Sequence, residues 1–174
     1  MLSPRMQEAL NAQINAEMQA FYTYLSMSAY FEAENLPGFA AWMKHHSDEE
    51  LGHAMRIYRF VNERRGRVIL TALSDPPTHW DSPLAAFESA LKHEQHVTSL
   101  INKLVDLAVE ERDHATQSFL QWFVDEQVEE ELIVDNAIQD LKRIGDFAPG
   151  IVMLDREFHA QAGKGEGETE ADAT

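Results

Sequence analysis

The feature that most restricts the fold of this chain is a polar layer in the middle of four long apolar seams. Four stretches place apolar side chains at alternating steps of three and four residues, which is the spacing of one face of an α-helix. Near its middle, each seam carries a carboxylate, namely Glu17, Glu50, Glu94 or Glu130. Burying one ionised carboxylate costs several kcal/mol unless something compensates its charge. Four helices with such groups at similar depth therefore indicate a shared cation at the centre of a four-helix bundle.

Caps and breaks divide the chain into five expected helices and no strands. Ser3-Pro4 and Ser82-Pro83 are typical helix starts, Asp113 is a capping residue, and Gly145 is a typical C-terminal residue. The expected helices cover about residues 4–34, 37–65, 83–111, 113–145 and 149–158. Short connections make the first two helices, and likewise the third and fourth, antiparallel hairpins, and residues 66–82 are long enough to cross the whole bundle.

The seams also predict that the polar groups meet at one level. The third stretch, for example, gives a seam of Leu84, Phe87, Leu91, Glu94, Thr98, Ile101 and Val105. Glu17 and His53 lie at nearly equal separations from the first turn. Glu94 and Glu130 lie at equal separations from the second. Because a helix rises about 1.5 Å per residue, each pair should reach the same depth.

Glu50-x-x-His53 is the most specific motif in the chain. Residues three apart lie on one helix face, so both side chains can bind the same ion. Oxygen-rich ligation with one imidazole and no thiolate suits iron or manganese, and tolerates zinc. We expect Glu50 to bridge two ions, with Glu17 and His53 on one and Glu94 and Glu130 on the other.

Several of these residues have a simpler interpretation. Any one of Glu17, Glu94 or Glu130 could be a solvated residue if its helix were rotated, although all would have to be misplaced together. Tyr24 lies seven residues after Glu17, so its hydroxyl either approaches the site, with a role in electron transfer or hydrogen bonding, or packs in the core. For His46, on the second seam, we expect a hydrogen-bonded core histidine rather than a ligand.

A second acidic group lies beside the seams. Glu126, Glu129 and Glu130 share one face of the fourth helix, next to Gln127. Together with Glu49 they could hold a third, more exposed ion; the alternative is ordinary surface charge. Trp122 is off the seam and is expected to pack.

Charge and composition exclude several classes of protein. The chain has 14 Lys+Arg against 30 Asp+Glu, a formal charge of −16, which argues against nucleic acid or an anionic membrane as a partner. The absence of cysteine excludes thiolate zinc sites and iron–sulfur clusters. No signal peptide or membrane-spanning run is visible, so we expect a cytoplasmic protein with one domain, residues 1–160, and a disordered Gly/Glu-rich tail, residues 161–174.

Over residues 1 to about 160, these motifs make the chain resemble the haem-free prokaryotic ferritins. Glu17 and Glu94 match the single glutamates of ferritin-like bundles, and Glu50-x-x-His53 matches one of their two Glu-x-x-His motifs. The second motif is replaced by Gln127-x-x-Glu130. Leu51 stands where bacterioferritins carry a haem-binding methionine, so the resemblance implies no haem.

The resemblance implies a ferroxidase that stores iron. Fe(II) would bind at a di-iron centre of two ions per subunit, formed by Glu17, Glu50, His53, Glu94 and Glu130, with Tyr24 beside it. Dioxygen or peroxide would oxidise it, and the product would enter a ferric mineral. Gln127 and Glu130 should weaken the second position and release oxidised iron, by way of Glu126 and Glu129.

The resemblance also implies a hollow shell of twenty-four identical subunits, with the fifth helix near the four-fold axes. Residues Phe147, Ile151, Leu154 and Phe158 give that helix an apolar face to bury.

Two other functions compete with this one. A di-iron oxidoreductase, such as a peroxidase, would consume oxidant without storing iron, and predicts a small oligomer with firmly bound iron. A non-enzymatic structural or interaction bundle predicts a small oligomer without metal.

Overall fold

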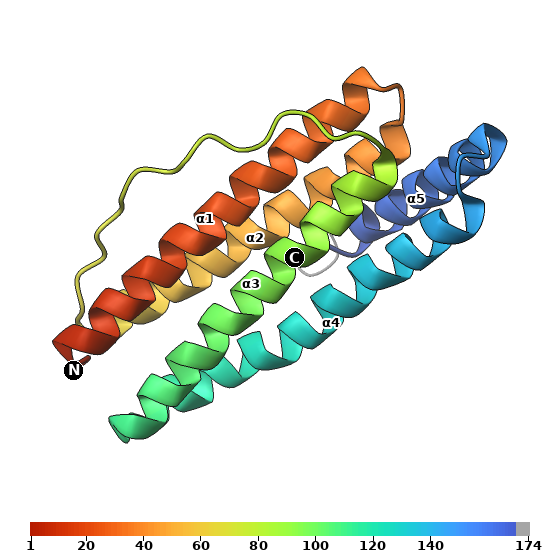
Figure 1. Ribbon diagram of the computed structural model, residues 1–174. Helices are drawn as coiled ribbons and strands as arrows, with labels where there is room; N and C mark the ends of the chain where they lie inside the picture. The colour runs from red at the N-terminus through yellow and green to blue at the C-terminus, as the bar shows by residue number, and fades with distance from the viewer. Residues whose placement is uncertain (170–174) are drawn as a thin grey trace.

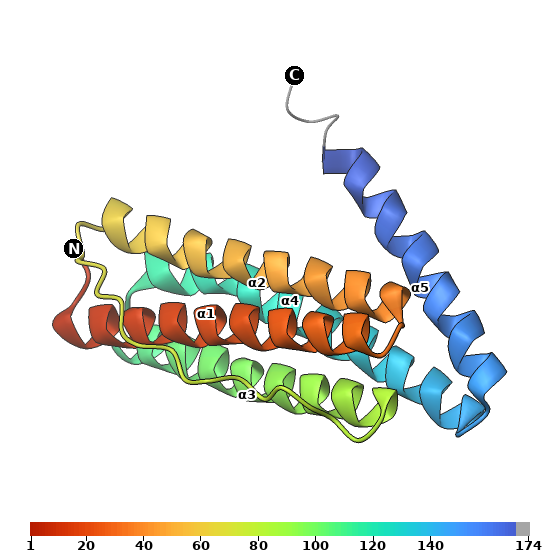
Figure 2. The same cartoon turned by 90° about the horizontal axis from the view of Figure 1, so that it is seen from above.

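Four antiparallel helices form the body of the molecule, and a fifth crosses one end of it (Figures 1 and 2). The computed structural model describes the backbone of residues 1–169 and the side chains of residues 1–160. The helices are α1 (Pro4–Ala33), α2 (Pro37–Glu63), α3 (Pro83–Glu110), α4 (His114–Ile144) and α5 (Ala148–Thr169). The expected four-helix bundle with a long crossover and an additional C-terminal helix is confirmed.

Three of the helices begin as their sequences predict. The side chains of Ser3, Ser82 and Asp113 each accept a hydrogen bond from the backbone N–H three residues later. These bonds satisfy donors that a helix leaves unpaired in its first turn. The local sequence therefore determines where α1, α3 and α4 start.

Helix α2 is capped by a residue from another helix. Leu36, at its N-cap position, has no side-chain acceptor, and the carboxylate of Asp155 in α5 accepts a hydrogen bond of 2.9 Å from the Phe39 N–H instead. A Cβ atom on Gly38 would lie 1.7 Å from the carbonyl oxygen of Asp155. Only glycine, which lacks that atom, allows α5 to approach α2 so closely.

The fifth helix is longer than the sequence indicated. It runs from Ala148 to Thr169 rather than ending near Phe158, because no proline follows Pro149 to stop it. Leu154 and Phe158 are buried as expected, but Phe147 precedes the helix and is 64% exposed in this chain. The disordered tail expected over residues 161–174 stays a prediction, and residues 170–174 lie outside the described part.

The core has two apolar halves with the polar layer between them. One half includes Phe31, Phe39, Phe87 and Phe158, and the other includes Leu10, Ile14, Ile57, Ile101 and Phe123. The buried polar side chains between these halves are Glu17, Glu50, His53, Glu94, Gln127 and Glu130. The packed halves thus hold the polar groups of all four helices at one depth.

Helix α3 is rotated relative to its expected seam. Leu84, Leu91, Thr98 and Val105 are only half-buried, whereas Ala90, Val97 and Leu104 are buried. Glu94 lies on the line that both sets share and is fully buried. The rotation turns Thr98 away from the core centre and towards α4.

The crossover, residues 66–82, runs along α1 without regular secondary structure (Figure 1). Polar side chains on one face of α1 bind its backbone, and these are Gln7, Asn11, Asn15, Gln19, Ser26 and Tyr30. This attachment leaves the apolar side chains of Ile69, Leu70 and Leu73 exposed. Within the described residues, no helix is sufficiently long and apolar to span a bilayer.

Candidate metal centre

Glu17, Glu50 and His53 form a compact group of potential ligands in the middle of the bundle. Their exposed fractions are 1%, 2% and 6%, and one ligand atom of each lies within 4.8 Å of the other two. Glu50 and His53 are one turn apart in α2, with Oε2 of Glu50 3.3 Å from Nδ1 of His53. Glu17 reaches the same point from α1, as its seam predicted.

Two carboxylate oxygens in this group lack a hydrogen-bond partner. Gln13 donates a hydrogen bond of 2.8 Å to Oε1 of Glu17. Oε2 of Glu17 and Oε2 of Glu50 are buried, and neither has a hydrogen-bond partner within the described structure. Buried polar atoms are almost always satisfied, so a pair of unsatisfied anionic oxygens beside an imidazole fits a bound cation.

Without a cation, these carboxyl groups hold their protons more tightly. Burial, followed by repulsion from Glu50, raises the pKa of Glu17 well above its ordinary value. Burial, followed by repulsion from Glu94, does the same to the pKa of Glu50. A divalent ion would reverse both effects by stabilising the ionised forms.

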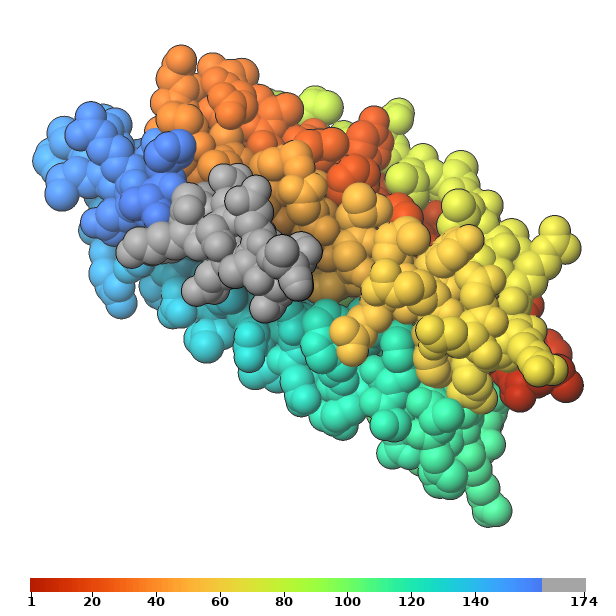
Figure 3. All heavy atoms as spheres, turned by 180° about the vertical axis from the view of Figure 1, so that it is seen from behind, coloured from red at the N-terminus to blue at the C-terminus, as the bar shows by residue number. Residues whose placement is uncertain are grey.

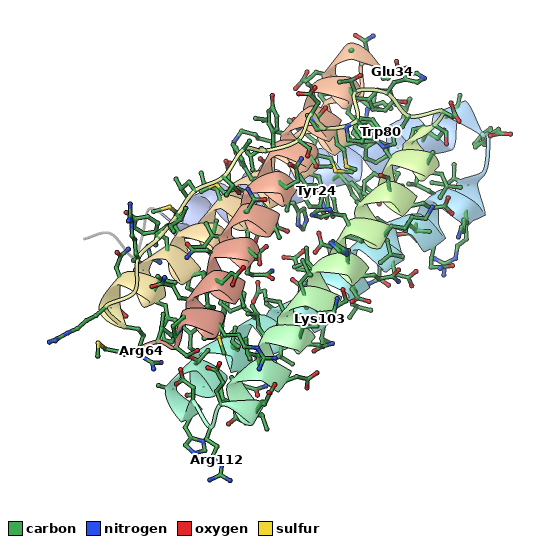
Figure 4. The ribbon with its side chains drawn as sticks, turned by 60° about the vertical axis from the view of Figure 1, so that its left-hand side comes forward. Tyr24, Glu34, Arg64, Trp80, Lys103 and Arg112 are labelled. Carbon is green, nitrogen blue, oxygen red and sulfur yellow. The ribbon has the colours of Figure 1, made fainter. Side chains whose placement is uncertain are left out.

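Glu94 is held by hydrogen bonds to both of its carboxylate oxygens. The Tyr24 hydroxyl donates to Oε1 and the Gln127 amide donates to Oε2 at 3.3 Å. In Figure 4, Tyr24 lies between α1 and α3. Burial raises the pKa of Glu94 to about 7. Of the two roles considered for Tyr24, the structure shows both core packing and a hydrogen bond to a candidate ligand.

Glu130 belongs to two further groups of potential ligands, one with His46 and Glu49 and one with His53 and Glu126. Nδ1 of His46 lies 3.2 Å from Oε2 of Glu130. Burial alone would raise the pKa of Glu130, but the imidazoles of His46, His53 and His45 together more than offset this and lower it. Glu130 therefore connects the His53 end of the site to a more exposed position.

The more exposed position does not match the expected ligand set in full. Glu49 and Glu126 are half-buried and lie in two different groups around Glu130, one with His46 and one with His53, whereas Glu129 is exposed and joins no three-residue group among residues 1–160. His46, expected to be a core histidine, is buried beside Glu49 and Glu130. In the sequence, the position of His46 on the seam, four residues before Glu50, was the feature that could have indicated its place next to the polar layer. Figure 3 shows the side of the molecule on which α2 and α4 lie.

Gln127 lies in the polar layer with its amide nitrogen directed at Glu94. The nitrogen is 3.2 Å from the Glu94 carbonyl oxygen and 3.2 Å from the Thr98 hydroxyl. An amide nitrogen has no lone pair available for a metal, so the ligand role predicted for Gln127 would require its oxygen, Oε1. The sequence alone did not reveal the contacts of Thr98 and Gln13 with this layer.

The site brings together carboxylate oxygens from all four bundle helices and two imidazoles from α2, and most of these side chains are buried. It fits divalent cations that accept mixed oxygen and nitrogen ligation, among which iron also exchanges electrons. Carboxylates favour the higher oxidation state of such an ion because they stabilise positive charge.

The comparison with protein families agrees with this geometry. Residues 7–144 match the ferritin-like domain of the ferritin family, a span that includes all four bundle helices except the first residues of α1.

Individual relatives and solved structures are similar over nearly the whole chain. A bacterial non-heme ferritin of Bacteroides fragilis (strain 638R) is 45% identical over 158 residues, covering 91% of this chain and 98% of the relative. A bacterial non-heme ferritin of Staphylococcus aureus (strain USA300) is 38% identical over 161 residues, covering 92% and 97%. The open pore ferritin of the hyperthermophilic archaeon Archaeoglobus fulgidus superposes with a TM-score of 0.90 at 49% identity, covering 91% of this chain and 98% of that one.

Proposed function

Since the chain belongs to the ferritin family, as a haem-free prokaryotic ferritin, we propose that it oxidises iron(II) at the buried centre and stores the product. The observation that carries this proposal is the pair of buried, unpartnered carboxylate oxygens on Glu17 and Glu50 beside His53. A protein that did not bind a cation there would gain stability by replacing these groups with apolar ones.

We assign the substrate ions to two positions that share Glu50. Glu17, Glu50 and His53 hold the first iron(II), and Glu50, Glu94 and Glu130 hold the second. Two ions give up one electron each, and dioxygen takes both electrons with two protons to become hydrogen peroxide. When peroxide is the oxidant, it takes two electrons and two protons and becomes two waters. Tyr24 keeps Glu94 in place during this exchange.

The second position is the one from which oxidised iron leaves. Gln127-x-x-Glu130 supplies one carboxylate where a second Glu-x-x-His would supply a carboxylate and an imidazole, so it holds its ion less firmly. The product passes towards Glu49, Glu126 and Glu129, which hold a third ion with Glu130. His46 forms a group of potential ligands with two of these residues, Glu49 and Glu130.

Storage requires an enclosed volume, and we propose a cytoplasmic shell of twenty-four copies without haem. The exposed apolar side chains of Ile69, Leu70 and Leu73 on the crossover, and of Val128 and Leu132 on α4, support burial against other copies. Phe147 and helix α5 would then lie near the four-fold axes.

Aerobic iron(II) titration of the purified protein, followed by sizing with in-line iron detection, tests the proposal. A very large particle that accumulates many irons per chain is the expected result. A dimer with two firmly bound irons would show an oxidoreductase instead, and a small metal-free oligomer would show a structural bundle.

A further inference from the structure

The amide of Gln127 has one direction that its surroundings permit. Its Nε2 faces the carbonyl oxygen of Glu94, which can only accept hydrogen bonds, as well as the Glu94 carboxylate. If the amide were rotated by half a turn, its oxygen would face the carbonyl oxygen and the carboxylate of Glu94. All of these atoms are hydrogen-bond acceptors, and they would repel one another. The donor face of Gln127 must therefore point at Glu94.

Thr98 and Glu131 reinforce this direction from the other side. The Thr98 hydroxyl donates to Oε1 of Glu131 at 2.6 Å. A hydroxyl has one proton, so once Thr98 donates to the carboxylate, its oxygen can only accept from Gln127, which it does at 3.2 Å. A chain of three hydrogen bonds thus runs from Glu131 through Thr98 and Gln127 to Glu94.

We propose that Thr98 and Glu131 are positioning residues that orient Gln127 and, through it, the iron ligand Glu94. This inference rests on the proposed function, because Glu94 matters only if it binds a metal ion. Glu131 and Thr98 do not belong to any of the groups of potential ligands in the described structure. Their effect is confined to the ion that Glu94 binds, since Glu17 is held separately by Gln13, a residue of its own helix α1.

The space around these hydrogen bonds makes it possible to test whether Thr98 affects only one of the two ion positions. Thr98, Gln127 and Glu131 line a cavity of 320 Å³ between α3 and α4, together with Ile101, Asn102, Val124 and Val128. Thr98→Val keeps the branched shape of the side chain and removes its hydroxyl, which is the difference that matters in such an exchange. A change in metal binding in Thr98→Val therefore reports the lost hydrogen bonds.

The experiment is anaerobic cobalt(II) titration of the assembled, full-length protein, followed by visible absorption and resolved into two binding steps. Thr98→Val should weaken one step by about two- to tenfold, the effect of losing an ordinary hydrogen bond between neutral groups such as that from Gln127, and leave the other unchanged. Thr98→Ser should restore that step, and Glu131→Leu should weaken it less than Thr98→Val does. Asn102→Ala, which alters the same cavity outside the hydrogen-bonded chain, serves as the control and should bind like wild type.

A double variant decides whether Thr98 acts through Gln127. If it does, Thr98→Val combined with Gln127→Leu should bind cobalt no more weakly than Gln127→Leu alone. Three results would overturn the inference and leave the metal centre standing. The double variant could bind cobalt more weakly than Gln127→Leu by the full factor of Thr98→Val, or Thr98→Val could weaken both binding steps equally. Thr98→Val could also bind cobalt like wild type. Wild-type protein that binds no cobalt would overturn the centre itself, and this inference with it.

Discussion

The indole ring of Trp122 lies edge-on to the imidazole of His53, with the ring centroids 5.3 Å apart. The guanidinium of Arg56 lies over the face of the indole, 4.0 Å from the ring centroid. Trp122 is off the apolar seam of α4 and was expected to pack, and these contacts show what it packs against. Trp122 thus contacts both side chains, and we expect it to help hold the His53 ring in place.

Trp122→Ala should therefore weaken the first ion position. Loss of an aromatic pair is worth about 0.5–1.5 kcal/mol, so the affinity of the step that uses His53 should fall by about two- to tenfold. Anaerobic cobalt(II) titration measures this step, and Trp122→Phe, which keeps a ring, is the control. Equal binding by Trp122→Ala and wild type would contradict the positioning role.

Glu50→Ala should damage both proposed ion positions, since we assign Glu50 to both of them. Stopped-flow absorbance after iron(II) addition should show oxidation slowed by about a hundredfold or more, because even outer-shell changes cost ten- to a hundredfold. Glu63→Ala, an exposed glutamate near the end of the same helix, should oxidise iron like wild type. An unchanged trace for Glu50→Ala would show that the shared carboxylate is misassigned.

Glu130→Ala should empty the second position and spare the first. Glu130 contacts His46 and belongs to groups on both sides of the centre, but Glu17, Glu50 and His53 form their group without it. A crystal soaked anaerobically with iron(II) should show one ion per centre instead of two. Loss of both ions in that crystal would argue against two separable positions.

The metal-free protein should become less stable as pH rises through neutrality. Burial raises the pKa of Glu94 from 4.5 to about 7, and those of Glu17 and Glu50 move in the same direction. The folded state then binds protons that the unfolded state has already lost, so its free energy of unfolding falls as pH rises from the ordinary carboxyl range.

Calorimetry of chelator-treated protein at about pH 5 and about pH 8 measures this slope. Saturating zinc should abolish it, because the ion replaces the protons. Glu94→Gln should reduce it. A metal-free protein that is more stable at the higher pH would contradict the raised pKa values.

Asp155→Ala should destabilise the start of α2 and loosen α5. Removal of an N-capping acceptor costs about 1 kcal/mol, which lowers Tm by about 2–4 °C in a chain of this size. Asp155→Asn keeps an acceptor oxygen for the Phe39 N–H and should lose less. Limited proteolysis should cut Asp155→Ala within α5 sooner than wild type, and equal rates would show that the contact does not hold the helix.

The parts of the fold that depend on neighbouring residues were predictable from the sequence. Ser3, Ser82 and Asp113 cap the helices they precede, and the bundle helices end within two residues of their expected limits. Capping and helical periodicity involve residues within a few positions of each other, so a linear sequence displays them directly.

Features that depend on contacts between helices were not predictable. Alternating steps of three and four leave the rotation of a helix uncertain by one position, and α3 is rotated enough to bring Thr98 to Glu131. The capping of α2 by Asp155 requires α5 to be docked first. The position of His46 beside Glu130 depends on how α2 and α4 pack.

The close contact between Gly38 and Asp155 has one more consequence. A single methyl group on residue 38 would push the last helix off the bundle and send the C-terminal segment in another direction. The direction that α5 takes is thus determined at the first turn of the chain, by a residue that has no side-chain carbon.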